Sequence, residues 1–397
     1  MFAKRQTPES SAGHASPIKV GFVTSLSGVG APGGHDMVAA IKLFMDEIGH
    51  QIAGRRVELI IEDDQHSVSL ALDVIRKLVD RDKVHVLMGT ISSNIAYGIA
   101  PSVDTMRVPM IIPIAGADDI TKRTRYNWLI RTGFSSSQYG HPFADYVRKH
   151  LGYSKVATFG LDYALGWELV GSFHKTFEEM GGKIVQKLWD SQNFVDFSAS
   201  MRRLVPSCDA VFFATSNLGA DRVATSFKQF GPNVPLIGAG PGFDETVLRD
   251  VGDGVLGAIS VSHHAAALKT PENTHFVNSY RRKYGADAAT SLFAEGSYTA
   301  GLWLKAAVET VGGKVEEKQA FLDALKAVQL RNAPRGPMRL DDYGNPIQNI
   351  YIRRVERVDG VLQNTVIHTY PNVSQFWNYE PGPYMKEPTF TRDYQPR

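Results

Sequence analysis

The segment Ile18–Ser27 (IKVGFVTSLS) opens the part of the chain that decides the fold, and the glycine-rich turn Gly28–Gly34 (GVGAPGG) and the segment His35–Gly49 follow it. The first segment is an apolar run of the kind that forms buried strands. Apolar residues of the third segment recur at helical spacing and would share one face: Met37, Ile41, Phe44, Met45 and Ile48. The order predicts a strand, a loop and a helix. A ligand on the loop would meet free N–H groups at the helix N-terminus.

The same strand–helix unit recurs along the chain. Apolar runs of a first series lie at 57–64, 84–89 and 108–114. Those of a second series lie at 155–160, 183–189, 209–215 and 234–238. Nearly continuous apolar strands are expected where helices cover both faces of a parallel sheet. The sequence therefore predicts an α/β protein with two doubly wound lobes.

The pattern changes from about residue 258. A lone strand precedes helical stretches near 272–284, 291–311 and 316–329, and the chain is strand-like again from Asn349. This return implies several chain crossings between the lobes. Ligands of open α/β sheets bind at the carboxyl ends of strands, so the loops there would line one cleft if the lobes face each other.

Composition limits the classes of function. The 397 residues carry 43 Lys and Arg against 41 Asp and Glu with no basic block, so nucleic acid is not indicated as a partner. The single cysteine, Cys208, cannot form an intrachain disulfide and is expected to be inert. No run of 18 apolar residues exists, so no membrane span is predicted.

Residues 1–17 are small and polar and are predicted to form a disordered leader. They lack the apolar core that a secretory signal needs. We therefore expect either a cytosolic protein or one whose signal was removed or lies upstream.

The first loop matches the dinucleotide fingerprint in its letters, with Gly28, Gly30 and Gly33 at the required spacing. Three extra residues separate the strand from the first glycine, and Pro32 removes an N–H from the turn. The first of the acids that end the second strand, Glu62, lies farther along the chain than the ~20 residues expected for a ribose-binding acid. A nucleotide site is thus disfavoured, and a tight turn or a small-ligand loop remains open.

Other catalytic or metal-binding patterns are missing. The chain has neither a P-loop lysine nor a Gly-x-Ser-x-Gly elbow. His263 and His264 are adjacent in a strand and would point to opposite faces, which argues against joint metal ligation. No carboxylate pair compels a catalytic assignment. We therefore predict no catalytic residue, no metal and no cofactor.

Two loops offer groups that suit a carboxylate. Ser92 and Ser93 follow a predicted strand and precede a helix, where hydroxyls and free N–H groups meet. Plain helix capping by these serines is an equal alternative. Ala115, Gly116 and Ala117 follow the next strand, and their small size lets a ligand approach the backbone.

An ordered set of short motifs identifies a resemblance. The motifs are Ile18–Phe22, Leu26–Gly28, Asp36-Met37, Asp46–Ile48, Glu62–Asp64, Gly89–Ser93, Ile130–Thr132 with Gln138, Asp162–Gly166 and Gly336-Pro337. Together they resemble the leucine/isoleucine/valine-binding protein family, the type I periplasmic substrate-binding proteins of branched-chain amino acid ABC transporters. The resemblance implies two Rossmann-like lobes, three crossover strands and hinge closure on a ligand.

The resemblance also implies domain boundaries. Lobe 1 would comprise 18–133 and 262–340, and lobe 2 would comprise 134–261 and 341–375. Apart from the resemblance, the four prolines near the C-terminus predict an extended tail over 376–397, in which the aromatic stretch Phe376–Tyr379 is expected to be packed. The implied partners are a small carboxylate ligand and the membrane permease subunits of the transporter. We therefore expect the protein to be periplasmic and monomeric and not to be an enzyme.

The resemblance places ligand-binding residues on particular positions. The ligand carboxylate would meet Ser93, Ala115 and Gly116. Several positions depart from the residues usual in amino-acid-binding members. Glycine replaces a tyrosine at Gly33, a hydroxyl residue at Gly116 and the ammonium-binding glutamate at Gly240. A tyrosine that is usual in the second lobe is replaced by Leu165, with Tyr163 two residues away. Ser216 or Asn217 stands where another tyrosine is usual.

These departures bear on the ligand. An ammonium buried without a carboxylate costs several kcal/mol, so a site that lacks one should reject amino acids. Asp244 or Glu245 would replace the glutamate if the loop shifts. If neither reaches the pocket, a small aromatic or other apolar acid is expected, with room for a ring at the three glycines. A branched-chain amino acid, an amide, a cytosolic ligand sensor and, last, an NAD-dependent dehydrogenase remain alternatives.

Overall fold

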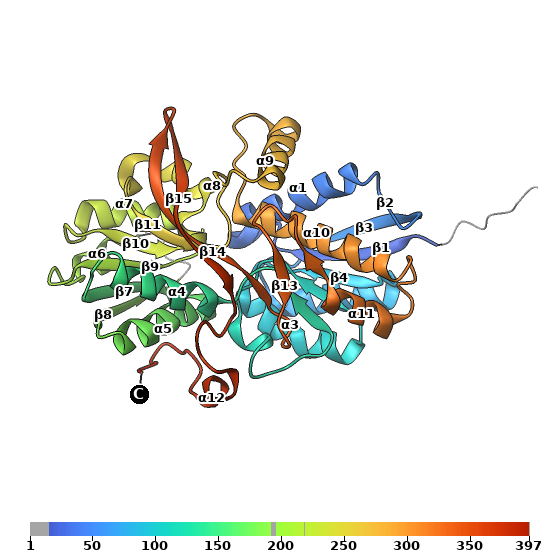
Figure 1. Cartoon of the computed structure of the whole chain (residues 1–397), viewed down its shortest axis with the longest axis horizontal. Coiled ribbons are helices and arrows are strands. Elements are labelled where there is room, and N and C mark those ends of the chain that lie inside the picture. Colours follow the sequence, from blue (N-terminus) through green and yellow to red (C-terminus); the bar gives the residue numbers. More distant parts are fainter. Residues whose placement is uncertain (1–15, 192–195, 218, 397) are drawn as a thin grey trace, which may run out of the picture.

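The computed structural model describes residues 16–191, 196–217 and 219–396. Its strands form two sheets that lie side by side, each flanked by helices (Figure 1). The predicted fold class, α/β with two lobes built on parallel sheets, is confirmed. The predicted leader lies almost wholly outside the described residues.

The first sheet has the strand order β2-β3-β1-β4-β5-β6. Its strands are β1 (Ile18–Thr24), β2 (Gln51–Ile52), β3 (Arg55–Asp63), β4 (Val86–Gly89), β5 (Met110–Ile112) and β6 (Leu129–Arg131). All pairings except that of β2 with β3 are parallel; Val20 of β1, for example, is in register with Leu59 on one side and Val86 on the other. The helical segments that follow these strands are α1 (Ala31–Glu47), α2 (Val68–Arg76) with the π turn η2 (Lys77–Arg81), α3 (Ser93–Met106) and the 3-10 turn η3 (Asp118–Ile120).

The second sheet contains the second series of strands. In the order of the sheet it comprises β12 (Gln329–Leu330), β13 (Met338–Leu340), β14 (Pro346–Val358), β11 (Ile259–Ser262), β10 (Leu236–Ala239), β9 (Ala210–Ala214), β7 (Lys155–Leu161) and β8 (Lys183–Asp190), and β15 (Val361–Val373) pairs with β14. Its helices are α4 (Ser136–Lys149), α5 (Ala164–Glu179), α6 (Ser198–Arg202), α7 (Ala220–Phe230) and α8 (Glu245–Val251), with the 3-10 turns η4 (Gly240–Phe243) and η5 (Gly252–Val255).

After β11 the chain returns to the first lobe and forms α9 (Pro271–Tyr284), α10 (Leu292–Thr310) and α11 (Lys318–Ala327). Figure 1 shows α10 and α11 beside the strands of the first sheet, and α10 packs against α1. The antiparallel hairpin β14–β15 then joins the second sheet. The proposed lobe boundaries rest on this path, although β12 and β13 pair with β14 and not with the first sheet.

The first loop is shorter than the sequence predicts. The 3-10 turn η1 (Gly28–Gly30) leads directly into α1, which begins at Ala31, so Gly33 and Gly34 lie in its first turn. Pro32 is favourable there because the first helical N–H groups have no intrahelical partner. A Cβ added at Gly34 would lie 1.8 Å from the Ser25 carbonyl oxygen, so the close packing of helix and strand requires glycine.

Buried arginines stabilise the segments that cross between the two lobes. The Arg335 guanidinium donates to the Thr132 carbonyl at 3.1 Å, and its Nε donates to Glu295 of α10 at 2.9 Å. Arg353 of β14 donates to the carbonyl of His264, which follows β11, at 2.9 Å. Each charged group is fully buried and bonded to neighbouring backbone or to an opposite charge, as burial of a charge requires.

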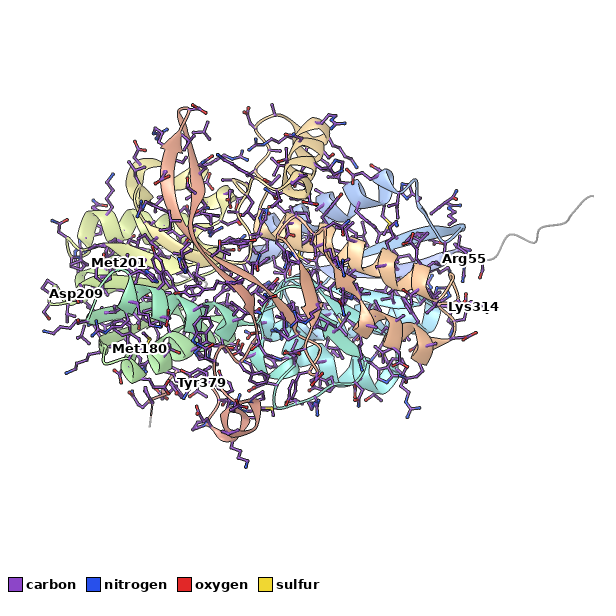
Figure 2. All side chains as sticks on the ribbon, in the orientation of Figure 1. Arg55, Met180, Met201, Asp209, Lys314 and Tyr379 are labelled. Carbon is purple, nitrogen blue, oxygen red and sulfur yellow. The ribbon has the colours of Figure 1, made fainter. Side chains whose placement is uncertain are left out.

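The C-terminal segment differs from the predicted extended tail. It contains helix α12 (Pro381–Lys386), and its side chains Phe376, Tyr384, Phe390 and Tyr394 form a buried cluster. Tyr379, labelled in Figure 2, bonds to Thr176 of α5 at 2.9 Å. The packing predicted for Phe376–Tyr379 is confirmed. The extended course predicted for the proline-containing end is wrong at α12, because aromatic residues on either side of it bury their surface together.

Among the described residues, no helix is both long enough and apolar enough to span a membrane.

Candidate functional site

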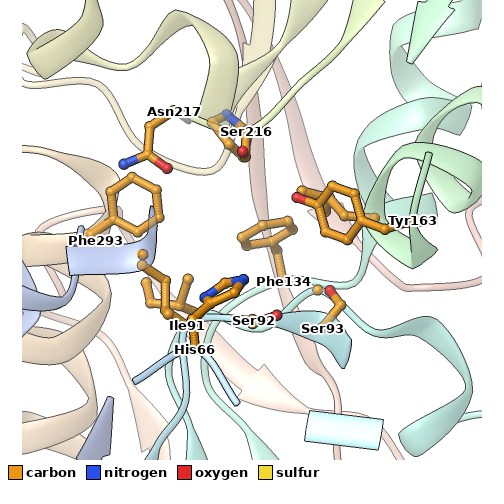
Figure 3. A pocket seen from close by; sticks show the side chains of 14 residues that line it. His66, Ile91, Ser92, Ser93, Phe134, Tyr163, Ser216, Asn217 and Phe293 are labelled. Carbon is orange, nitrogen blue, oxygen red and sulfur yellow. The ribbon is translucent and has the colours of Figure 1, made fainter. Parts of the chain in front are cut away.

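A small cavity lies between the two lobes, at the carboxyl ends of their strands. Figure 3 shows side chains from both lobes pointing into it. The residues that line it are Gly30, His66, Ile91, Ser92, Ser93, Ile114, Gly116, Phe134, Tyr163, Leu165, Ser216, Asn217, Pro241 and Phe293. Its largely apolar lining with a few convergent polar groups is typical of a small-molecule site.

One polar wall belongs to the first lobe. Ser92 and Ser93 stand at the N-terminus of the 14-residue helix α3, after β4. The Ser92 side chain makes no capping hydrogen bond, so capping does not explain this serine. The first N–H groups of a helix lack intrahelical partners and carry partial positive charge. This wall can therefore receive a carboxylate through hydroxyl and N–H donors.

The opposite polar wall belongs to the second lobe. Tyr163 precedes α5, and Ser216 and Asn217 follow β9 (Figure 3). Burial raises the pKa of the Tyr163 phenol above its usual value, while a hydrogen bond with Ser216 opposes the shift. Tyr163 is therefore a neutral hydroxyl at physiological pH, able to donate or accept.

Aromatic side chains close the cavity between these walls. Phe134, in the segment that crosses between the lobes, stacks on Tyr139 with ring centroids 4.3 Å apart. Phe293 projects from the first turn of α10. Ile91 and Leu165 add aliphatic surface. The cavity thus offers flat apolar faces to a ligand.

His66 also lines the cavity. Its backbone φ is 57°, and its N–H donates to the Asp64 carboxylate at 2.9 Å. Burial lowers the pKa of the imidazole, although the nearby Asp64 charge opposes this. His66 is therefore mainly neutral at pH 7, and its ring is a donor or an acceptor for a ligand but not a fixed positive charge.

None of the described lining residues has a carboxylate side chain. Asp244 lies elsewhere: its Oδ2 accepts from the Leu292 N–H at 2.8 Å, and its Oδ1 accepts from Thr246 at the start of α8. Glu245 accepts from the Ala266 N–H at 3.1 Å. Burial raises the pKa of Asp244 to about 8. The expectation that Asp244 faces the ligand is wrong because α8 and α10 take its carboxyl group as a cap.

The glycine positions differ in what surrounds them. A Cβ at Gly33 would lie 2.5 Å from Ile91 Cδ1 and 3.3 Å from Phe293 Cδ1, so side chains fill the space there. A Cβ at Gly240 would meet Ser262 at 2.8 Å, and the neighbouring Pro241 lines the cavity instead. Of the three positions where glycine replaces a larger residue of the family, only Gly116 is among the residues that line the cavity.

Two neighbours of Gly116 lie behind the wall. Ala115 and Ala117 are fully buried and do not line the cavity. The Ala115 N–H donates to the Thr90 carbonyl at 3.1 Å, and the Ala117 carbonyl accepts from Arg131. These backbone hydrogen bonds of Ala115 and Ala117 stabilise the loop. Of the three residues, only Gly116 lines the cavity.

The acids after β3 stabilise the first loop. The Asp63 carboxylate accepts from the Leu26 N–H at 2.7 Å and from the Ser27 hydroxyl at 2.6 Å. Asp64 accepts from the Ser25 hydroxyl at 2.6 Å. Both carboxylates thus accept hydrogen bonds from the first loop. They are not free to bind a ribose hydroxyl, as the acid of a dinucleotide site would.

Sequence reasoning missed Gly30, His66, Ile91, Ile114, Phe134, Pro241 and Phe293 as cavity residues. Most of these directly adjoin predicted loops at strand ends, so the rule that ligands bind there could have found them. Phe293 comes from a helix that begins 30 residues after β11 ends, and no local signal marks it.

Comparison with known families gives one match over most of the chain. Residues 17–360 match the sequence model of a family described as periplasmic binding protein. A curated relative from Brucella suis, named Leu/Ile/Val-binding protein homolog 6, is 28% identical over 368 residues, which cover 91% of this chain and 93% of the relative.

Solved structures give matches of similar extent. An ABC transporter substrate-binding protein from Sphaerobacter thermophilus has 32% identity and a TM-score of 0.86, covering 91% of this chain and 99% of its own. A solute-binding protein of an ABC transporter from R. palustris, solved in complex with benzoate, has 29% identity and a TM-score of 0.84, covering 90% and 98%.

Proposed function

Because the chain belongs to the periplasmic binding protein family, we propose that it captures a small aromatic or other apolar carboxylate that lacks an amino group. The protein is a solute-binding component of the ABC transporter type, and members of its family are extracytoplasmic. The proposed site is the interlobe cavity, closed over the ligand by a hinge motion.

The observation that carries this proposal is the lining of the cavity. It contains hydroxyl, amide and imidazole groups but, among the described lining residues, no carboxylate. Asp244 and Glu245 are engaged elsewhere. A ligand ammonium buried here would lack a charged partner, at a cost of several kcal/mol. The lining therefore favours an acid without an amine over leucine and its relatives.

The carboxylate end of the ligand is assigned to the start of α3. Ser92 and Ser93 bring two hydroxyls, and the helix N-terminus contributes N–H donors and favourable electrostatics. No fixed positive charge lines the described part of the cavity, so these neutral donors would stabilise the carboxylate.

The apolar body of the ligand is assigned to the space between the two polar walls. Phe134, Phe293 and Leu165 surround it, and Tyr163, Ser216 and Asn217 offer hydrogen bonds at its rim. Planar rings gain from stacking on aromatic faces. The relative from R. palustris that was solved with benzoate supports the same ligand class for this chain.

The remaining parts of the proposal follow from the family. We propose membrane permease subunits as the partner, a periplasmic location, action as a monomer and no catalytic activity. A branched-chain amino acid is the second candidate, favoured by the curated relative's name.

A thermal-shift screen of the purified protein tests the ligand class. The panel contains benzoate, 4-hydroxybenzoate, leucine, isoleucine and, as an uncharged control, benzamide. We expect benzoate-type acids to raise the melting temperature and leucine and benzamide to leave it unchanged. A shift with leucine and none with the aromatic acids would contradict the proposal.

A further inference from the structure

A buried carboxyl group joins the two lobes just behind the cavity wall. Glu168 lies on α5 of the second lobe and is 5% exposed. Its Oε1 accepts from the Tyr97 hydroxyl at 2.6 Å and from the Asp118 N–H at 3.1 Å, both of the first lobe. Its Oε2 lies 2.8 Å from the Ser136 hydroxyl, at the start of α4.

The contacts around Glu168 can accommodate a proton on its Oε2. The Tyr97 oxygen accepts from the Asp119 N–H at 2.9 Å and is therefore free to give its own hydrogen to Glu168 Oε1. The Ser136 hydroxyl lies 2.9 Å from the Gly116 carbonyl, which can only accept. A hydroxyl has one hydrogen. The Gly116 carbonyl also accepts from the Ser136 N–H at 2.9 Å, so the Ser136 hydrogen can go to either oxygen. With a proton on Glu168 Oε2, Ser136 donates to Gly116 and accepts from Glu168, and both contacts are kept.

None of the salt bridges among the described residues pairs Glu168 with a cation. The groups that face it are Tyr97, Asp118, Asp119, Lys122, Arg131 and Tyr163. The cations among them have other partners. Lys122 pairs with Asp118 at 3.1 Å, and Arg131 donates to backbone carbonyls, including that of Phe134 at 3.1 Å. Burial, followed by the Asp118 charge, raises the pKa of Glu168 to about 8.

Glu168 also lies close to the proposed carboxylate subsite. Gly116 lines the cavity, and its carbonyl contacts the same Ser136 hydroxyl that contacts Glu168. An ionised Glu168 would oppose a ligand anion across this wall, because charges in the low-dielectric protein interior are weakly screened. A neutral Glu168 would leave the site compatible with an anion.

We propose that Glu168 is a positioning residue that bridges the lobes as a neutral carboxylic acid, and that loss of its proton weakens the capture of anionic ligands. The second half of this statement rests on the proposed function. The first half concerns the protein alone, so the two can fail separately.

The first experiment needs no ligand. Infrared difference spectra of the purified chain are recorded as the pH rises from 6 to 9.5. Because the pKa of Asp244 is also about 8, the spectra are compared in an Asp244→Asn background. In this background we expect a carbonyl band of a protonated carboxylic acid that disappears near pH 8 and is missing when Glu168→Gln is added. The control Glu309→Gln, an exposed glutamate paired with Lys305, should keep the band. An Asp244→Asn spectrum without this band at pH 6, or one in which the band survives Glu168→Gln, would overturn the proposal.

The second experiment measures benzoate affinity over the same pH range. We expect the wild-type affinity to fall by about tenfold between pH 8 and pH 9.5, because a group with a pKa near 8 is then mostly ionised. The amide of Glu168→Gln imitates the neutral acid, so its profile should be flat and its affinity above the wild type at pH 9.5.

Identical pH profiles for wild type and Glu168→Gln would overturn the link to ligand capture. Glu168→Ala, which removes the bridge to Tyr97, should bind more weakly than Glu168→Gln throughout the range. If no carboxylate binds at all, the proposed function and the link to capture both fail, and the infrared band still decides the state of Glu168.

Discussion

The Asp244 carboxylate accepts a hydrogen bond from the Leu292 N–H at 2.8 Å and is thereby held away from the interlobe cavity. This contact joins the start of α8 to the start of α10 and caps a helix of the other lobe. It leaves the described cavity lining without a carboxylate, which is the basis of the proposed preference for acids that lack an amine.

Asp244→Asn tests this assignment directly. The amide keeps the shape of the cap, so benzoate affinity should stay within about twofold of the wild type by isothermal calorimetry. If Asp244 instead neutralised a ligand ammonium, the variant would lose roughly 1.5–3 kcal/mol of binding free energy for an amino acid. Loss of leucine binding in this variant would contradict our account.

Ser93→Ala tests the carboxylate subsite. Removal of a hydroxyl that bonds to a charged ligand should cost about 1.5–3 kcal/mol, or roughly a tenfold to hundredfold loss of benzoate affinity. Ser69→Ala is a matched control, because Ser69 lies on the exposed side of α2 and bonds to Ser67. Equal affinities for the two variants would remove Ser93 from the site.

Phe134→Leu tests the aromatic face. Leucine keeps most of the apolar volume, so the loss should be confined to ring stacking, worth about 0.5–1.5 kcal/mol. We expect the affinity for benzoate to fall more than that for an aliphatic acid of similar size, such as cyclohexanecarboxylate. A parallel loss for both acids in calorimetric titrations would indicate a general packing defect.

Stability should depend on pH through buried histidines. Burial, with a contribution from the Lys187 charge, lowers the pKa of His174 to about 4, so the unfolded chain binds this proton more readily. The free energy of unfolding should therefore fall as the pH drops from about 6.5 to 4. The contribution is at most about 1.4 kcal/mol per pH unit.

His174→Gln should reduce this slope in urea unfolding measured at several pH values. His275→Gln, which changes an exposed histidine beside Glu47, is the matched control and should leave the slope unchanged. An unaltered slope in His174→Gln would show that other groups carry the acid sensitivity.

The two α/β lobes could be predicted from the sequence because buried parallel strands are nearly continuous apolar runs. The sequence was also sufficient for the cavity residues that follow strands directly, such as Ser93, Tyr163 and Asn217. In each case the position after a strand end determines which edge of the sheet a residue occupies.

Other positions could not be assigned in this way. The spacing from a strand end does not tell whether a side chain points into the cleft or into a helix cap, and Asp244 does the second. Gly33 lies inside α1 because the helix begins at Ala31, earlier than the apolar pattern indicates. Phe293 reaches the cavity from a distant helix, through tertiary packing that periodicity does not encode.

The central claim is that the interlobe cavity accepts an aromatic acid and rejects an amino acid. Calorimetric titration of the purified chain with benzoate, and separately with leucine, at pH 7 tests it most directly. Our account predicts saturable one-to-one binding of benzoate and no heat of binding with leucine. Saturable binding of leucine without any for benzoate would contradict it.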